Sequence, residues 1–347
     1  MEQMQLFAGL DMHGDSTTGT IKDEQGNEVR VLKVPTSSDG IRSLFARLQK
    51  KSIKAVFEAS KNWPYYAELI RPYCQEIILA HPLKVRAIAS ARIKTDTIDS
   101  NILSDLLRAD LIPESYMPSA EIVELRELLR YRCYLSRQRG ALKIKAKAIL
   151  SREGKKCEFD EVTGKRARMW LNHLELTEMN RRELDYVVCL IDNFSLEVQK
   201  INGKIEQEQY RYPEVEILKS IPGIDTYSAL LVIAEVADFG RFPTPYQLCS
   251  YAGLVPSTHQ SSNICYNGRI TKQGSKWLRW ILVQCAHASV KTRTSHRLKR
   301  FFLRIARRKG EKKAIVATAR KMMIIIWHLL DKNCYYEAGV KFGLQAP

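Results

Sequence analysis

The first hundred residues alternate between short apolar runs, turn residues and helical periodicities. A short apolar run at 5–10 and the segments 17–21 and 28–34 predict three strands, and the polar stretch at 23–27 is typical of a turn between the second and the third. Runs at 53–57 and 76–80 predict two more buried strands. The start of the chain is therefore predicted to form a sheet of five strands.

Two helices are predicted between the later strands. Ile41, Leu44 and Leu48 recur at helical spacing after Asp39, which can cap the helix, and Pro64 suits the first turn of a second helix. The predicted order is βββαβαβ, with further helices starting near residues 83 and 97. An antiparallel three-strand start followed by α/β crossovers is typical of the RNase H and RuvC-like fold, so we expect such an α/β domain over residues 1–118.

The strand pattern disappears beyond residue 119. Apolar residues at helical or near-heptad spacing continue to about residue 209, which predicts a helical or coiled-coil region over 119–212 that either joins subunits or packs internally. Pro213 marks the next boundary, and residues 213–347 are predicted to be mainly α-helical. There, Pro-Gly-Ile at 222–224 resembles a helix-hairpin-helix element, whose turn at Gly223 either approaches a phosphate or is a plain connector.

The charge pattern indicates a polyanionic partner. The formal net charge is +17, and residues 261–330 hold 17 Lys and Arg against one acidic residue, Glu311. Because Lys and Arg displace condensed counterions from phosphates, we expect nucleic-acid binding. The candidate contact residues are Lys94, Gly223, Arg269, Lys272, Lys276 and Arg279. Trp277 and Trp280 either stack on bases or fill a helix core.

The composition indicates the cellular compartment of the protein and the redox state of its cysteines. The chain has 347 residues, 45% of them hydrophobic, which is enough for more than one domain. It has no apolar run of membrane-spanning length and no leader-like start, so we expect a cytoplasmic protein with no membrane partner. Eight cysteines are scattered without a C-x-x-C pair, which favours reduced structural thiols over a zinc or redox site.

Four acidic residues stand at the ends of predicted elements. Asp11 ends the first strand and Glu58 ends the fourth, so both lie at one sheet edge if these strands are neighbours. Asp96 and Asp99 are spaced i, i+3 and share a helix face. Each acid alone can be an ordinary turn or cap residue. Together they would repel one another unless cations neutralised them, which favours a site for Mg²⁺ or Mn²⁺ able to polarise a phosphate.

Several motifs, taken in order, resemble bacterial insertion-sequence transposases of the one-hundred-and-ten family. They are GLD, FEAS, KTDTIDS, LKSIPGI, YAGLVPSTHQSS and GRITKQGSKWLRW, and they span nearly the whole chain. The resemblance implies a RuvC-like domain with the metal ligands Asp11, Glu58, Asp96 and Asp99, a coiled coil that assembles a dimer or tetramer, and a C-terminal serine transposase domain. It also implies a bridge RNA that pairs with donor and target DNA.

The resemblance also places a nucleophile at Ser261, where the residues alone are typical of a loop. A serine that attacks a phosphodiester keeps one DNA end as a phosphoserine ester, but its alcohol needs a base, a metal or preorganised donors. His259, Arg269 and Lys272 are near in sequence and can aid positioning or stabilise charge. Ser262 is the alternative nucleophile, because family members commonly have glycine there.

The sequence leaves three functions open. The preferred one is an RNA-guided recombinase that cuts and rejoins DNA at a composite site of carboxylates and serine. The second is a RuvC-like nuclease that hydrolyses branched DNA with metal-activated water and forms no covalent intermediate. The third is a non-catalytic nucleic-acid scaffold in which the acids are incidental. The segment ASKNWPYY after Glu58 departs from the glycine-containing version common in the family, so nucleic-acid contacts there are expected to differ.

Overall fold

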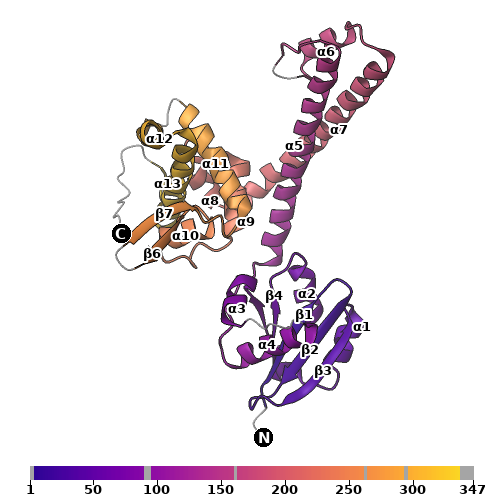
Figure 1. Cartoon of the computed structure of the whole chain (residues 1–347), viewed down its shortest axis with the longest axis vertical. Coiled ribbons are helices and arrows are strands. Elements are labelled where there is room, and N and C mark those ends of the chain that lie inside the picture. Colours follow the sequence, from indigo (N-terminus) through magenta and orange to yellow (C-terminus); the bar gives the residue numbers. More distant parts are fainter. Residues whose placement is uncertain (1–3, 90–94, 160–161, 262–263, 293–295, 337–347) are drawn as a thin grey trace. The chain divides into compact units, whose positions relative to one another are not determined.

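The computed structural model describes residues 4–89, 95–159, 162–261, 264–292 and 296–336. The chain divides into two compact units, with the boundary between Met117 and Pro118. Unit 1 is a mixed α/β unit, and unit 2 is helical apart from one β-hairpin (Figure 1). The predicted regions 119–212 and 213–347 both belong to unit 2, and their separation into two domains stays a prediction.

Unit 1 is built around a five-stranded mixed sheet with the order β3-β2-β1-β4-β5. The strands are β1 (Leu6–Met12), β2 (Ser16–Lys22), β3 (Glu28–Pro35), β4 (Ile53–Glu58) and β5 (Glu76–Ala80). The pairs β1–β2 and β2–β3 are antiparallel, whereas β1–β4 and β4–β5 are parallel. The predicted order βββαβαβ is confirmed, and it is compatible with an RNase H-like domain.

Helices cover both faces of this sheet. They are α1 (Ser38–Leu44), α2 (Trp63–Ile70), α3 (Pro82–Ile88) and α4 (Asp96–Arg108). Leu10 and Phe57 belong to a core with α1 and α2, whereas Val56 belongs to a second core with α3 and α4. Because successive side chains of a strand point to opposite faces, Asp11 and Glu58 are directed to the face that α4 covers.

Helix α4 lies close against β1 because Gly9 has no side chain. A Cβ at Gly9 would overlap the carbonyl oxygen of Ser100 and the backbone nitrogen of Ser104. The Ser104 hydroxyl donates to the Phe7 carbonyl at 2.9 Å, and the hydroxyls of Thr20 and Ser100 are also 2.9 Å apart. These contacts hold the first turns of α4 against β1 and β2.

Unit 2 contains a long helical hairpin and a compact body. Its helices are α5 (Ala120–Arg152), α6 (Lys165–Asn172), α7 (Glu178–Glu208), α8 (Glu214–Lys219), α9 (Thr226–Val236), α10 (Pro245–Tyr251), α11 (Lys276–Lys291), α12 (His296–Lys309) and α13 (Glu311–Asp331). Helices α5 and α7 pack along each other with α6 at the tip of their hairpin (Figure 1). The helical character predicted for residues 120–209 is thus confirmed.

Separate apolar cores stabilise the tip of this hairpin and the body. Ile149 of α5 and Leu184 of α7 are fully buried near α6. Leu129 and Ile205, at the other ends of the same helices, join the body around α9. All residues of α9 after Thr226 are buried, so this helix is the centre of the body.

The turn between α8 and α9 contains the glycine of the predicted helix-hairpin-helix element. Gly223 has φ +94°, in the left-handed region that favours glycine, and a Cβ there would overlap the backbone of Cys285 and Ser289 in α11. Close packing on α11 therefore accounts for this glycine. A phosphate contact at Gly223 stays a prediction.

Two interpretations of local sequence were wrong. Ser37, not Asp39, caps α1, because the Ser37 hydroxyl accepts a hydrogen bond from the backbone N–H of Gly40 at 3.2 Å. The segment predicted as a loop and helix is instead an antiparallel hairpin of β6 (Pro256–Ser261) and β7 (Ile264–Ile270). Its polar composition gives no continuous apolar face, which is the signal that period-two patterns detect.

The described helices and thiols agree with the compositional analysis. Among the described residues, no helix is long and apolar enough to cross a membrane. The seven cysteines that the structure describes are free. Burial raises the pKa of Cys74 and of Cys285 to about 12, so both thiols stay protonated near neutral pH.

Candidate metal centre

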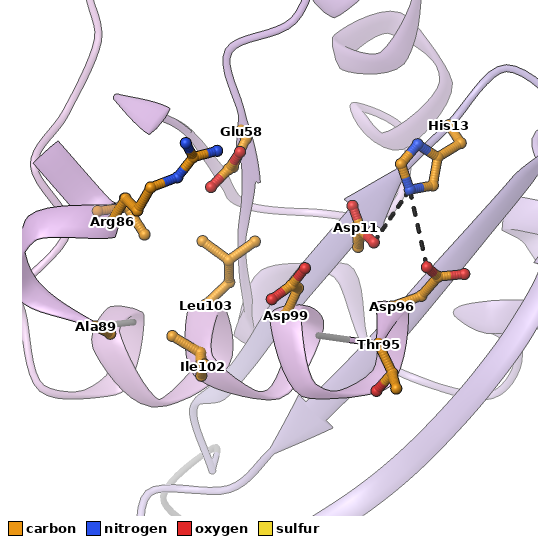
Figure 2. Close-up of a pocket in the computed structure, with 11 residues that line it drawn as sticks. Asp11, His13, Glu58, Arg86, Ala89, Thr95, Asp96, Asp99, Ile102 and Leu103 are labelled. Carbon is orange, nitrogen blue, oxygen red and sulfur yellow. Dashed lines mark hydrogen bonds and ion pairs between the residues drawn. The ribbon is translucent and has the colours of Figure 1, made fainter. Parts of the chain in front are cut away.

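The four predicted acids line one cavity in unit 1. Asp11, Glu58, Asp96 and Asp99 surround a volume of about 350 Å³, together with His13 (Figure 2). Asp11 and Asp99 face the middle of this space, Glu58 lies on one side, and Asp96 and His13 lie on the other. Residues from three separate segments of the chain thus meet in one place.

The sheet positions two of these carboxylates. Leu10 of β1 pairs with Phe57 of β4 in parallel register. Asp11 and Glu58 are the next residues on each strand, so they leave the sheet at the same level. The expectation that the first and fourth strands are neighbours is confirmed.

The first turn of α4 positions the other two. Thr95 is the N-cap, and its hydroxyl accepts a hydrogen bond from the backbone N–H of Ile98 at 3.2 Å. Neither Asp96 nor Asp99 is the N-cap of α4, so the alternative interpretation of these two acids as N-cap residues is wrong. Both carboxylates lie in the positive N-terminal turn of the helix, where negative charge is stabilised.

His13 belongs to the same cluster and was missed in the sequence. Its Nε2 lies 3.2 Å from Asp11 Oδ2 and 4.0 Å from Asp96 Oδ1. One ligand atom from each of these three residues falls within 4.8 Å of the others. Glu58 and Asp99 line the cavity outside this closest group. Strand alternation was the available signal, because His13 stands two residues after Asp11.

Negative charge is distributed unevenly among the carboxylates of the cavity. Burial raises the pKa of Asp11, and the charges of Asp96 and Asp99 raise it further, although His13 acts in the opposite direction. Asp96 is partly neutralised, since Lys33 Nζ lies 2.7 Å from Asp96 Oδ2 and lowers the pKa of that carboxyl. Negative charge is therefore concentrated around Asp11.

Arg86 is a second lining residue that the sequence did not indicate. It extends from α3, and its guanidinium points toward Glu58 (Figure 2). An exposed cation at the rim of an acidic cavity can contact a phosphate oxygen bidentately. Arg86 thus supplies the charge opposite to that of the four acids.

The donor set fits a hard divalent cation. Carboxylate oxygens are the ligands that Mg²⁺ and Mn²⁺ prefer, and imidazole is tolerated by Mn²⁺ but is less typical of Mg²⁺. The charges of Asp96 and Asp99 contribute to the raised pKa of Asp11, and a bound cation would neutralise this negative charge. The residues present therefore agree with a divalent metal site.

The predicted nucleophile lies in unit 2. Ser261 is the last residue of β6 and pairs in register with Ile264. The side chains of Ser261 and His259, together with Ser262 and Lys94, lie outside the described residues. The catalytic role of the serine stays a prediction.

The basic residues at the end of the hairpin and just after it divide into two kinds. Arg269, Lys272 and Lys276 are exposed and accessible to a polyanion. Arg279 instead donates hydrogen bonds to the carbonyls of Ala252 and Lys272, each at 3.2 Å, and so connects the end of the hairpin to the end of α10. A structural role accounts for Arg279, and nucleic-acid contact by these four residues stays a prediction.

A buried carboxylate anchors the segment that follows the hairpin. Both Nε and Nη2 of Arg130 donate to Glu235 Oε1, at 2.9 and 2.7 Å, while the Ser275 hydroxyl donates to Oε2 at 2.8 Å. Ser275 also caps α11. Trp277 lies under Arg130 and Arg137, so this indole packs within the protein. The network links α5, α9 and α11.

Carboxylates converging at the ends of parallel strands, in a chain with a strongly basic helical unit, are typical of enzymes that process nucleic acids. Two family models match successive parts of the chain. One, described as a transposase with the DEDD signature of IS110 elements, matches residues 8–153, and the other, described as transposase IS116/IS110/IS902 family, matches residues 215–302. The chain belongs to this family of transposases, which are enzymes that cut and rejoin DNA.

Curated relatives carry matching descriptions. A putative transposase y4qE of Sinorhizobium fredii is 26% identical over 81% of this chain and 71% of its own length. A probable family 20 transposase of Pseudomonas aeruginosa is 25% identical over 86% of this chain and 89% of its own. The transposase for insertion sequence element IS1111A of Coxiella burnetii is 37% identical, over 35% of this chain and 34% of its own.

Proposed function

We propose that this transposase cuts and rejoins DNA with a divalent metal held by Asp11, Glu58, Asp96 and Asp99 and with Ser261 as the nucleophile. The observation that carries the proposal is the single cavity that all four acids line. Strand order and helical spacing in the sequence predict the same four acids, and three separate segments of the chain supply them. Convergence of such residues is unfavourable without a cation, which supports a metal-binding role.

The acidic residues and Arg86 around the cavity have different binding roles. Asp11 and Asp99, in the middle, and Glu58 and Asp96, at the sides, would hold Mg²⁺ or Mn²⁺. The bound ion supplies charge stabilisation for a phosphate oxygen. Arg86 at the rim can orient the same phosphate through its guanidinium.

The covalent step assigned to Ser261 conserves one phosphodiester bond. Its Oγ attacks phosphorus and gives up a proton to a base, while the bond from phosphorus to one deoxyribose oxygen breaks and that oxygen takes up a proton. The product is a phosphoserine ester and a free hydroxyl end. Attack of a DNA hydroxyl on this ester restores the serine and joins the strands without an external energy source.

Guidance and assembly complete the proposal. A bridge RNA that pairs with donor and target DNA selects the sites, and the excess of basic residues in 261–330 supports binding of such polyanions. The α5–α7 hairpin exposes apolar side chains, among them Tyr186 at 73% and Leu190 at 46%, which supports its use in joining two or four copies.

The metal site is tested by neutralising single acids. Asp11→Asn and Asp99→Asn are expected to abolish Mn²⁺ binding in calorimetry and DNA cleavage, while leaving DNA affinity intact in the presence of EDTA. The matched control is Asp39→Asn, because Asp39 lies on α1 with a side chain 89% exposed. Cleavage at the wild-type rate by the Asp11 and Asp99 variants would falsify the metal site.

The serine step is tested by trapping. Wild-type protein incubated with end-labelled DNA and denatured is expected to give a protein–DNA adduct, which Ser261→Ala abolishes and Ser262→Ala retains. An adduct that depends on Ser262 would move the nucleophile by one residue. Cleavage without any adduct in the wild type would favour metal-activated water instead.

The RNA component is tested by sequencing nucleic acid that copurifies with the full chain. A structured RNA with stretches complementary to donor and target DNA is expected. Cleavage of the same target by protein stripped of RNA would contradict guidance.

A further inference from the structure

Helix α12 has the most one-sided charge of any helix in the described part of the chain. Its 14 residues, HRLKRFFLRIARRK, include seven Lys and Arg and no acidic residue. Arg300, Arg304, Arg307 and Arg308 are exposed along it. Arg300, Arg304 and Arg308 are four residues apart and therefore share one face, about 6 Å from one to the next along the axis.

The opposite face of α12 is already used for folding. Leu298 is fully buried in the body of unit 2, and Phe302 packs against the same core. The helix lies against α13 and α11 (Figure 1). Because the apolar face is covered by protein, α12 cannot insert that face into a lipid surface as a membrane-bound amphipathic helix does.

Several exposed cations of α12 have no carboxylate partner in the described part of the chain. Among the described residues, Lys299, Arg300, Arg307 and Arg308 form no ion pair with a carboxylate. Arg304 and Lys321 both lie over the ring of Phe301, at 5.5 and 4.6 Å from its centroid. Burial lowers the pKa of Lys321, and neighbouring arginines lower it further, so positive charges here repel one another.

Charge of one sign at this density destabilises the compact state through repulsion, whereas several surface cations elsewhere in the described part of the chain have an acidic neighbour. Arg42, Arg71 and Arg182 are examples, each beside an acid three or four residues away on its own helix. The contrast distinguishes α12 from an ordinary solvated helix face. Its charge is arranged for an external anion.

We propose that the exposed face of α12, formed by Arg300, Arg304 and Arg308 with Lys299 and Arg307 beside them, binds the phosphate backbone of duplex DNA. The proposal rests on the DNA substrate of the proposed function, but it does not depend on the metal site or the serine. A regular row of cations on a straight helix suits the regular charge of a duplex, which carries one phosphate per roughly 1.7 Å of axis. The contacts would position DNA without reading its sequence.

The test is the salt dependence of binding. Arg300→Gln/Arg304→Gln/Arg308→Gln is compared with wild type on a DNA duplex, in EDTA, over a range of salt concentrations. The plot of log K against log salt has a negative slope, and each lost phosphate contact reduces the magnitude of that slope by about 0.9. The magnitude is therefore expected to fall by about 2 to 3 in the triple variant. The fall should be the same for specific and scrambled duplexes.

Matched variants separate this effect from net charge and from misfolding. Arg42→Gln/Arg71→Gln/Arg182→Gln removes the same number of charges from paired positions and should leave the slope nearly unchanged. The corresponding triple change of the α12 arginines to Lys should retain the slope. Should the Gln triple fail to fold, Arg300→Gln/Arg308→Gln is expected to lower the slope by about 2.

Three results would overturn the assignment. One is an unchanged slope in folded α12 variants, and another is an equal fall in the control triple. The third is a loss of affinity confined to a single-stranded RNA of the same length. Because binding is measured without metal, failure of the metal site or of the serine step leaves this readout unchanged, so the two proposals fail separately.

Discussion

Carboxylates in the two units of this protein are surrounded in opposite ways. In unit 1, Asp11 lies with Asp96 and Asp99 around an open cavity, and burial together with these neighbours raises its pKa. In unit 2, Glu235 is 2% exposed, and its two oxygens accept hydrogen bonds from Arg130 and Ser275. The first arrangement accumulates negative charge, whereas the second neutralises it.

Hydrogen-bonded and mutually repelling carboxylates have different physical consequences. A buried carboxylate with all its hydrogen bonds made is a structural group, and removing one partner leaves an uncompensated charge. A cluster of carboxylates that repel one another is unfavourable in isolation and becomes favourable when a cation binds. Removing the carboxylate of Glu235 should therefore lower the stability of unit 2. Neutralising a carboxylate of the cavity in unit 1 should lower metal affinity without lowering stability.

The largest effect is expected at Glu235. Glu235→Ala removes the buried acceptor of Arg130 and Ser275 and should lower the free energy of unfolding of unit 2 by about 2 to 4 kcal/mol, because hydrogen bonds to a charged group are lost while the Arg130 side chain, 38% exposed, can be hydrated. Urea denaturation followed by circular dichroism measures this change. Glu216→Ala is the control, because Glu216 is an exposed partner of Lys219 and should cost less than about 1 kcal/mol. Equal losses in both variants would contradict the structural role of Glu235.

The next effect is expected at Gly9, where α4 meets β1. Gly9→Ala pushes the backbone of Ser100 and Ser104 away, which should cost about 1 to 3 kcal/mol and separate Asp99 from Asp11. Thermal unfolding and Mn²⁺ calorimetry should both show the loss. Gly14→Ala is the matched control, since a Cβ at Gly14 meets nothing within 4 Å. Normal Mn²⁺ affinity in Gly9→Ala would show that the close approach of α4 does not form the site.

A smaller and opposite effect is expected at Lys33. Its ammonium neutralises Asp96, so Lys33→Ala should strengthen Mn²⁺ binding by about threefold to tenfold, the size of an interaction of roughly 1 kcal/mol near a protein surface. Calorimetry at low salt measures it. Lys54→Ala removes a lysine paired with Glu76 in the same unit and should leave the affinity unchanged. Weaker binding in Lys33→Ala would mean that the lysine supports the site.

The smallest effect is expected in the stability of unit 1 without metal. Asp11→Asn removes a carboxylate that its neighbours repel, so in EDTA the variant should be as stable as wild type, or more stable by up to about 1 kcal/mol. Adding Mn²⁺ should raise the melting temperature of the wild type only. A loss of stability comparable with that of Glu235→Ala would place Asp11 among the structural carboxylates.

Local patterns were sufficient for much of unit 1. Short strand-like segments bounded by turn residues predicted all five strands, and the strand order brought Asp11 and Glu58 to one edge before any contact was known. The same patterns failed for the β6–β7 hairpin, because the sequence PSTHQS of β6 contains no apolar run that would mark a strand. His13 was missed because strand alternation places it on the same face as Asp11 but gives a lone histidine no ligand role without the position of Asp96.

Sequence patterns alone predict the element order of unit 1, the helical character of residues 120–209, the concentration of positive charge near the C-terminus and the four acids of the cavity. These follow from periodicity and composition, which act over a few neighbouring residues. Other contacts are visible only in the folded chain: Lys33 and His13 lie beside Asp96, Gly223 packs on α11, and Arg130 neutralises Glu235. Such pairings join residues up to 105 positions apart, and their energies depend on distance and burial, which no local pattern records.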